Sequence, residues 1–424
     1  MWINKLFRKL VFFLTVFFFS SSALWAAPVS VEDRALLTQI QKDTLQYFVH
    51  MSDKKTGLTR DSSQPGSPAS IAATGFSLAA FAIADSHGWL PDGYAENYVR
   101  KTLKALLRQT EHEQGFFFHF IDRQSGKRVW GSEASSIDTA LLLAGALLAG
   151  RYFPGSDIER MAQQIYNRIN WAWMLNGSAL VCMGWKPESG FLPYYWDSYN
   201  ELIILQALAI GASVNPIPPQ SWQEWVRWED EYAGKKIIYS HSGSLFTYQY
   251  SQAFIDFRGL NDGGINYFDN SKNATLANLE YSLAFRNQYR GYSENSWGLS
   301  ASLGPGGYKA YGAKPGEGLQ DGTVAPYAAI GSIVFSPEEA IRAIRYFHDN
   351  YKDRLYGHFG FKGAFNLDKN WWADQYLGID QGISFLMLEN FLNEGAVWKR
   401  FMPLEAVQTW IERTGLAGEI APVN

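Results

Sequence analysis

The stretch IDTALLLAGALLAG, residues 137–150, is apolar on every side of a helix. NELIILQALAIG, residues 200–211, has the same character, and TGFSLAAFAIADS, residues 74–86, is nearly as apolar. A helix without a polar face must be covered by protein on all sides. We therefore predict that these three helices lie in the interior, surrounded by other helices.

Amphipathic helices alternate with the apolar ones along the chain. Residues 156–174, for example, place Ile158, Met161, Ile165 and Ile169 on one helical face. Short segments of glycine and aromatic residues recur between the helices, as a helix-pair repeat would produce. About twelve helices are predicted, over residues 33–51, 74–86, 94–110, 137–150, 156–174, 200–211, 220–232, 245–256, 270–287, 325–334, 336–351 and 379–392.

Helices that are apolar on all sides alternate with amphipathic helices, a pattern that favours two concentric layers of helices. We therefore predict an all-α fold, an (α/α)6 toroid or double-layer helical barrel, and an irregular all-α domain is the alternative. No linker rich in proline, serine or charge divides the chain. Residues 27–424 are accordingly predicted to form a single domain.

The first 26 residues have the pattern of a secretory signal peptide. Lys5, Arg8 and Lys9 precede an apolar run over residues 10–19, and small residues follow up to Ala26 and Ala27. An uncleaved anchor is the alternative, but the apolar run is short for a spanning helix. The pattern predicts a periplasmic or secreted protein with no stable membrane insertion after cleavage.

Composition excludes several classes of function. The 424 residues carry 37 Lys and Arg against 41 Asp and Glu, a net charge of −4, which gives no basis for nucleic-acid binding. The one cysteine, Cys182, excludes an intramolecular disulfide and a cysteine-rich zinc site. The histidines lack zinc-site spacing, and GxSxG, GxGxxG and Walker A motifs are missing from the sequence. We therefore predict neither a metal nor another cofactor.

Aromatic residues make up 16% of the chain, and flat rings suit both protein cores and the apolar faces of sugars. Acidic residues occur among them at the starts of apolar helices. Glu133 and Asp138 lie at the start of the helix predicted over 137–150. Capping of that helix explains Asp138 but leaves Glu133 unexplained.

The segment YYWDSYNE, residues 194–201, precedes the next apolar helix and contains Trp196, Asp197 and Glu201. On a helix, Asp197 and Glu201 would face one side, and their repulsion would raise one pKa, as a general acid requires. The alternative is an exposed first turn with favourable contacts between acids and the helix dipole.

Three further segments contribute candidates for sugar binding. Residues 246–259 contain Tyr248, Gln252, Asp256 and Arg258, and Asp256 with Arg258 could equally be a structural ion pair. Trp297 precedes a long glycine-rich loop, and Asp380 begins the last strong apolar helix. Acidic residues at helix ends among aromatics suit glycoside hydrolysis by a pair of carboxyl groups.

Six long motifs, in order, resemble the bacterial glycoamylase-like family, which includes endo-β-1,2-glucanases. They are SIAATGFSLAAFAIA (70–84), SEASSIDTALLLAGALLA (132–149), GFLPYYWDSYNELIILQALAIG (190–211), LFTYQYSQAFIDFRG (245–259), DGTVAPYAAIGSIVFSPEEA (321–340) and WADQYLGIDQGISFLMLEN (372–390). The resemblance implies an (α/α)6 barrel that hydrolyses β-1,2-glucan with inversion and without metal. Relatives often carry histidine where this chain has Tyr248 and Gln252.

The resemblance also implies roles for individual residues. Glu201 is expected to be the general acid and Asp380 the general base, and Glu133, Asp138, Asp197 and Asp256 are expected to hold sugar or orient water. The expected partner is an oligosaccharide or polysaccharide. Hydrolysis or transglycosylation of another β-glucan and non-catalytic glycan binding in the periplasm remain alternatives. Endo or exo action and oligomeric state stay open.

Overall fold

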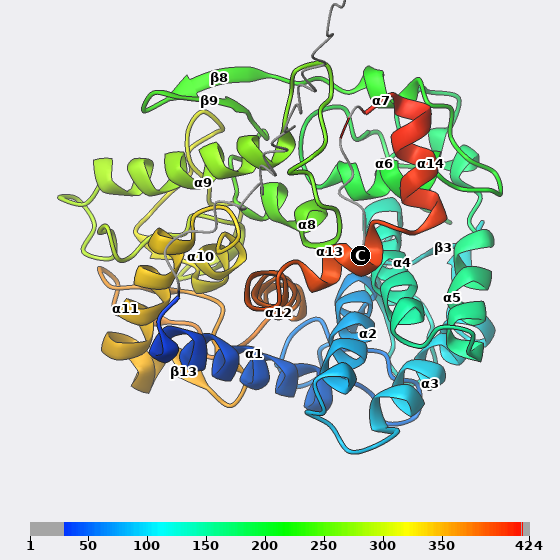
Figure 1. Ribbon diagram of the computed structural model, residues 1–424, viewed down its shortest axis with the longest axis horizontal. Helices are drawn as coiled ribbons and strands as arrows, with labels where there is room; N and C mark the ends of the chain where they lie inside the picture. Colours follow the sequence, from blue (N-terminus) through cyan, green and yellow to red (C-terminus); the bar gives the residue numbers. More distant parts are fainter. Residues whose placement is uncertain (1–28, 417, 419–424) are drawn as a thin grey trace, which may run out of the picture.

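The computed structural model describes residues 29–416 and 418, whose helices form two concentric rings (Figure 1). Six helices make the inner ring, each packing against the next, and the sixth packs against the first. Almost all of their residues are buried. The all-α toroid predicted from the apolar helices is confirmed. The inner helices are α2 (Ile71–Ser86), α4 (Ser136–Tyr152), α6 (Leu202–Ile210), α8 (Phe246–Phe254), α10 (Pro326–Gly331) and α12 (Gly378–Leu392).

Five long helices of the outer ring each cover an inner helix with an apolar face. In α5, Ser156 caps the first turn by accepting hydrogen bonds from the backbone of Ile158 and Glu159. The helix packs against α4, α1 packs against α12, and α3, α9 and α11 pack against α2, α8 and α10. The outer helices are α1 (Val31–Met51), α3 (Tyr94–Arg108), α5 (Asp157–Asn167), α9 (Tyr267–Ala284) and α11 (Pro337–Leu355).

The structure corrects the prediction of a helix over residues 220–232. Only the short helix α7 (Ser221–Glu224) forms there, and a β-hairpin of β8 (Glu229–Tyr232) and β9 (Lys235–Ile238) follows. The hairpin turns at Ala233 and Gly234, which both have positive φ. The predicted helix over 156–174 is also too long, because α5 ends at Asn167 and a 3-10 helix, η1 (Trp171–Leu175), follows.

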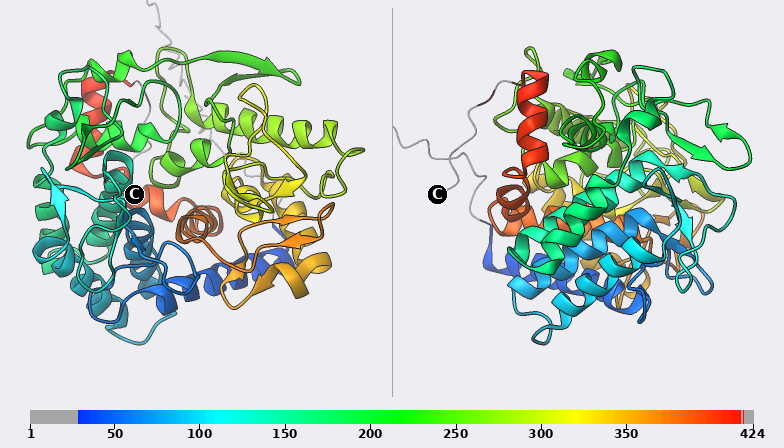
Figure 2. Two further views of the ribbon diagram at one scale, coloured as in Figure 1. Left: turned by 180° about the vertical axis from the view of Figure 1, so that it is seen from behind. Right: turned by 90° about the vertical axis from the view of Figure 1, so that its right-hand side faces the viewer.

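The sixth place in the outer ring is taken by the last helix of the described chain. After α12 come the short helix α13 (Ala396–Phe401) and α14 (Glu405–Thr414). Helix α14 packs against α6, where α7 is too short to cover it (Figures 1 and 2). The outer ring therefore contains helices from both ends of the described chain, α1 and α14.

The first residues of the inner helices meet at one end of the barrel, which we call its N-terminal end. The backbone N–H of Gly378, at the start of α12, donates to the carbonyl of Asp61 in the loop before α2. The N–H of Ile71, at the start of α2, donates to the carbonyl of His119. Short antiparallel strands also run directly into these helices: β1 precedes α2, β5 precedes α4 and β12 precedes α10.

These strands form small two- and three-stranded sheets, among them β1 with β4, β5–β6–β7 and β12–β15–β16. Their bounds are β1 (Ala69–Ser70), β2 (His112–Glu113), β3 (Phe116–Phe117), β4 (Phe120–Ile121), β5 (Ala134–Ser135), β6 (Gly184–Lys186), β7 (Gly190–Phe191), β10 (Ser302–Gly304), β11 (Gly307–Lys309), β12 (Thr323–Val324), β13 (Tyr356–Gly357), β14 (Gly360–Phe361), β15 (Phe365–Asn366) and β16 (Trp371–Trp372).

Helices α2 and α4 approach each other closely because two glycines face each other. A Cβ atom on Gly145 would overlap the carbonyl oxygen of Gly75, and one on Gly75 would meet the backbone of Leu141 and Leu142. Backbone contact of this kind leaves no space for larger side chains. Helices α2 and α4 therefore pack with their backbones in direct contact at these two glycines.

Within the described part of the chain, no helix combines the length and apolar character needed to cross a bilayer. The predicted signal peptide, residues 1–26, lies outside the described residues.

Candidate active site

Six titratable side chains from four parts of the chain come together at the N-terminal end of the barrel. We call this group the acidic cluster, and it consists of Asp61, His119, Glu133, Asp138, Glu201 and Asp380. The loop before α2 supplies Asp61, and the segment from β3 to α4 supplies His119, Glu133 and Asp138. Glu201 and Asp380 come from the starts of α6 and α12.

His119 is the positive member of the cluster. Its Nδ1 atom lies 3.1 Å from Oε1 of Glu133 and 3.6 Å from Oδ2 of Asp138. Burial by itself would lower the pKa of His119, but the charges of Asp138 and Glu133 outweigh burial and raise it to about 9. The imidazole is therefore a cation at neutral pH. In return, its hydrogen bond lowers the pKa of Glu133.

Asp138 is held by the helix that it begins. The Oγ atom of Ser135 donates to Oδ2 of Asp138 at 2.6 Å and accepts from the backbone N–H of Asp138 at 3.2 Å. Ser135 therefore caps α4, while the Asp138 carboxylate faces His119. Asp138 thus has both a structural contact and a place in the cluster.

Asp380 is buried in the first turn of α12, with 1% of its surface exposed. Among the described residues, no group donates a hydrogen bond to either carboxylate oxygen. Burial, and then the nearby charge of Asp61, raise the pKa of Asp380 well above its ordinary value. A buried carboxyl group without a donor is uncommon in folded proteins and calls for a functional explanation.

Glu201 precedes the first residue of α6 without capping it. Asn200 caps the helix instead, because its Oδ1 accepts a hydrogen bond from the backbone N–H of Leu202 at 2.8 Å. Ser251 of α8 fixes the position by donating to the carbonyl of Glu201 at 3.0 Å. Burial, with a further contribution from the charge of Asp138, raises the pKa of Glu201 to about 7. Its carboxyl group can thus hold a proton near neutral pH.

Three tyrosines lie near both Glu201 and Asp380. The charges of these two acids add to burial in raising the pKa values of Tyr250 on α8, Tyr327 on α10 and Tyr308 on β11. Tyr250 and Tyr327 are buried, whereas Tyr308 is 54% exposed. The two predicted catalytic acids therefore share surroundings to which four inner helices contribute.

The structure corrects the expected relation between Asp197 and Glu201. Helix α6 begins only at Leu202, so the two acids do not share a helical turn. Asp197 is exposed, and its Oδ1 accepts a hydrogen bond from Ser198 at 3.0 Å. The neighbouring acid that raises the pKa of Glu201 is Asp138.

Four of the predicted sugar-binding side chains are buried in the protein interior, and three of them form hydrogen bonds to the surrounding chain. The indole of Trp196 donates to Ser136 at 2.8 Å, and Tyr248 accepts from the backbone of Ser240 at 3.0 Å. The amide of Gln252 donates to the carbonyl of Tyr267 at 2.8 Å. Trp297 has no exposed surface. These residues support the barrel wall and do not belong to the acidic cluster.

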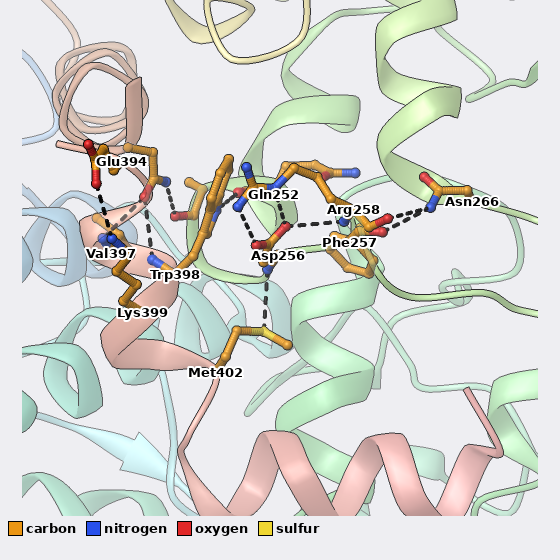
Figure 3. Close-up of polar contacts among 12 residues, drawn as sticks. Gln252, Asp256, Phe257, Arg258, Asn266, Glu394, Val397, Trp398, Lys399 and Met402 are labelled. Carbon is orange, nitrogen blue, oxygen red and sulfur yellow. Dashed lines mark hydrogen bonds and ion pairs between the residues drawn. The ribbon is translucent and has the colours of Figure 1, made fainter. Parts of the chain in front are cut away.

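Asp256 and Arg258 lie at the opposite end of the barrel. They follow the last residue of α8, Phe254, and form an ion pair with an oxygen to nitrogen distance of 2.7 Å. Figure 3 shows this pair beside Trp398 and Met402 of the chain that follows α12, and the Arg258 guanidinium lies 4.6 Å from the centre of the Trp398 ring. The interpretation of Asp256 and Arg258 as a structural ion pair fits these contacts. The expected contact of Asp256 with sugar does not fit its position at the end of the barrel away from the acidic cluster.

Sequence reasoning missed Asp61 and His119. Both lie in connections between helices, so helical periodicity gives no signal for them. One signal was available: His119 ends the glycine–aromatic segment 115–119, and these segments occupy the N-terminal end of the barrel.

The donor atoms of His119, Glu133 and Asp138 lie within 4.8 Å of one another, a spacing that a bound cation could also use. The carboxylate charges that raise the pKa of His119 would also attract a cation, and a metal would have to displace the imidazole proton. An ion-pair network accounts for the three side chains. Absence of a metal requirement remains a prediction, tested by activity after treatment with EDTA.

Comparisons with known proteins agree with this architecture. The family model described as glycoamylase, putative glucoamylase, matches residues 193–405. A putative glucoamylase from Bacteroides uniformis has a similar crystal structure, with a TM-score of 0.87, 30% sequence identity, and coverage of 93% of this chain and 99% of that one.

Two further relatives carry names that state a substrate. The endo-β-1,2-glucanase from Chitinophaga pinensis, solved with sophorotriose and glucose, is 25% identical with a TM-score of 0.85, covering 91% of this chain and 98% of its own. The exo β-1,2-glucooligosaccharide sophorohydrolase (non-reducing end) of Parabacteroides distasonis is 27% identical over 93% of this chain. The match spans 59% of the length of that curated relative. The family match and the Bacteroides uniformis structure show that this chain belongs to the glycoamylase family, as its motifs predicted.

Proposed function

We propose that this protein is a glycoside hydrolase that cleaves β-1,2-linked glucan with inversion at the anomeric carbon. The observation that carries the proposal is the pair Glu201 and Asp380, two carboxyl groups with raised pKa values beside the same three tyrosines. Glycoside hydrolysis uses such a pair, one group as acid and the other as base. The substrate follows from the names of the Chitinophaga pinensis and Parabacteroides distasonis relatives.

Glu201 is the proposed general acid. Its pKa of about 7 keeps a substantial protonated fraction at neutral pH, which an ordinary glutamic acid would not have. The proton would pass to the glycosidic oxygen, directly or through an intervening sugar hydroxyl, as the bond to the anomeric carbon breaks.

Asp380 is the proposed general base. It would take a proton from the water that attacks the anomeric carbon on the opposite face, so that the product has the inverted configuration. Sugar hydroxyls and the attacking water can supply the donors that the protein does not provide to its oxygens. The raised pKa makes the group a stronger base once ionised.

The remaining members of the cluster would bind sugar and balance charge. Glu133 and Asp138 are partly exposed and can accept hydrogen bonds from hydroxyl groups. The His119 cation limits the repulsion among the surrounding carboxylates. Asp61 adjusts the protonation of Asp380 through its charge.

The test is incubation with linear β-1,2-glucan, with product sizes read by chromatography and product configuration by NMR. Release of products with inverted configuration is expected, and their sizes distinguish endo from exo action. A panel of other β-glucans and cyclic glucan covers hydrolysis or transglycosylation of a different substrate. Binding of oligosaccharide without new reducing ends would identify a glycan-binding protein and contradict the proposal.

We also propose that the protein works outside the cytoplasm, on the basis of the pattern over residues 1–26. N-terminal sequencing of the protein from its natural source should find a chain beginning at residue 27 or 28, in the periplasm or the medium. Recovery of a chain that begins at Met1 would contradict cleavage.

A further inference from the structure

Trp130 is an exposed aromatic residue in an unfavourable backbone conformation. Its side chain is 70% exposed, and its φ of +58° lies in the left-handed region, which bulky residues rarely adopt. Exposure of a large apolar ring and local backbone strain are each uncommon, and strain of this kind is often kept where a residue has a function.

The loop around Trp130 is fixed on both sides. The backbone N–H of Val129 donates to the carbonyl of Phe120 at 3.1 Å, and that of Ser132 donates to the carbonyl of Val129 at 3.1 Å. Arg128 forms two hydrogen bonds with Glu188, at 2.7 and 2.8 Å. The backbone that carries the exposed indole is therefore fixed, which reduces the entropy cost of binding a ligand against it.

A surface hollow of about 360 Å³ lies against this indole. Its other walls come from the loop before α2, with Ser67 and Pro68, and from the turn after β4, with Asp122, Arg123 and Gln124. The positive charge of Arg123 lies near Asp122 and Asp53, whose pKa values it helps to lower, and its side chain lines the hollow. A flat ring beside hydroxyl, amide, carboxylate and guanidinium groups matches the apolar face and the hydroxyl edge of a sugar.

Two structural connections join the hollow to the acidic cluster. The Trp130 ring lies 5.1 Å from the ring of Phe120, which stacks on His119 at 3.9 Å. On the other wall, the carbonyl of Pro68 accepts a hydrogen bond from the backbone of Asp61 at 2.9 Å. The hollow is thus next to the acidic cluster.

We propose that this hollow is a further sugar-binding subsite, in which Trp130 stacks on a glucose unit some distance from the bond that is cleaved. The inference rests on the proposed function and adds to it a preference for longer chains. The subsite contributes binding energy and takes no part in bond cleavage.

The test measures binding in the Glu201→Gln background, where turnover does not interfere. Isothermal titration is carried out with long linear β-1,2-glucan and with sophorose, for the parent and for Trp130→Ala. We expect the alanine variant to bind the long chain about 10-fold to 100-fold more weakly and to bind sophorose with unchanged affinity. Trp130→Phe keeps a ring and should retain most of the affinity.

Tyr94→Ala is the matched control, because Tyr94 is 44% exposed and begins the outer helix α3, away from the acidic cluster. Thermal melting of each variant verifies that it is folded. Equal affinity of the parent and Trp130→Ala for the long chain would overturn the subsite and leave the proposed function intact. A parent that binds neither ligand would overturn the proposed substrate as well.

Discussion

His119 and Glu133 form an ion pair across the connection that joins β3 to α4, with 3.1 Å between Nδ1 and Oε1. Asp138 lies within 3.6 Å of the same nitrogen, and Asp61 is near enough to add to the raised pKa of His119. One imidazolium is therefore shared among three carboxylates. This arrangement makes the net charge at the start of α4 dependent on a single proton.

The His119 proton should make folding stability depend on pH. The pKa of His119 is about 9 when folded and near 6.5 when unfolded, so its stabilising contribution is fully present below pH 6.5 and is lost as the pH rises through 9. Because the side chain is partly exposed, we expect a loss of about 1–2 kcal/mol. Urea unfolding of wild type and His119→Gln across this range measures it, and parallel curves would contradict the assignment.

Glu201→Gln should reduce turnover by about 10³-fold while glucan binding remains. The variant should also be more stable than wild type above pH 7. A group with a raised folded pKa stabilises below its unfolded value of 4.5 and loses that contribution as the pH rises through about 7. The neutral amide avoids this loss, so we expect a gain of about 2 kcal/mol at pH 8 and little difference at pH 4.

Glu224→Gln on the exposed surface of α7 is the control for Glu201→Gln, and it should change neither turnover nor stability. Near-normal turnover of Glu201→Gln on β-1,2-glucan would remove Glu201 from its proposed role. Thermal melting at the two pH values tests the stability prediction independently of any substrate.

Asp61→Asn should change the pH dependence of catalysis. The charge of Asp61 contributes to the raised pKa of Asp380, so the neutral variant should let Asp380 ionise at lower pH. We expect the acidic limb of the kcat/KM profile to move to lower pH. A profile that keeps its shape and falls uniformly would instead assign Asp61 to sugar binding.

Asp256→Asn should leave kcat/KM unchanged, because the ion pair with Arg258 lies at the far end of the barrel from the acidic cluster. The loss of a partly exposed ion pair should lower the free energy of unfolding by about 0.5–1 kcal/mol. Steady-state kinetics and denaturant unfolding test the two parts. A large loss of activity without loss of stability would restore Asp256 to a role in substrate binding.

The architecture could be predicted because the inner helices are apolar all round, and only a second layer can cover such helices. The sequence patterns do not predict helix α14. They predict a helix over residues 220–232, where the structure has the short helix α7 and a β-hairpin. The hairpin there depends on the Ala233–Gly234 turn, and the alternation of its strands is weak in a four-residue exposed segment.

The site could be predicted only in part. Asp138, Glu201 and Asp380 begin apolar helices, and inner helices that run in one direction bring their first turns together. The same reasoning places Asp256 at the other end, because it follows the last turn of α8. Tyr248 and Tyr250 show why the sequence does not identify every residue that faces the site. Two positions apart on one helix they face different ways, and sequence does not say which side faces the acids.

The last helix of the described chain, α14, fills the sixth position of the outer ring, and this affects folding during synthesis. Helix α6, which follows Glu201, emerges from the ribosome about half a chain earlier than the helix that shields it. Until synthesis of that covering helix is finished, the apolar surface of α6 stays open to water or chaperones. Complete burial of α6, the helix that follows Glu201, is therefore reached only after residues 405–414 have been synthesised.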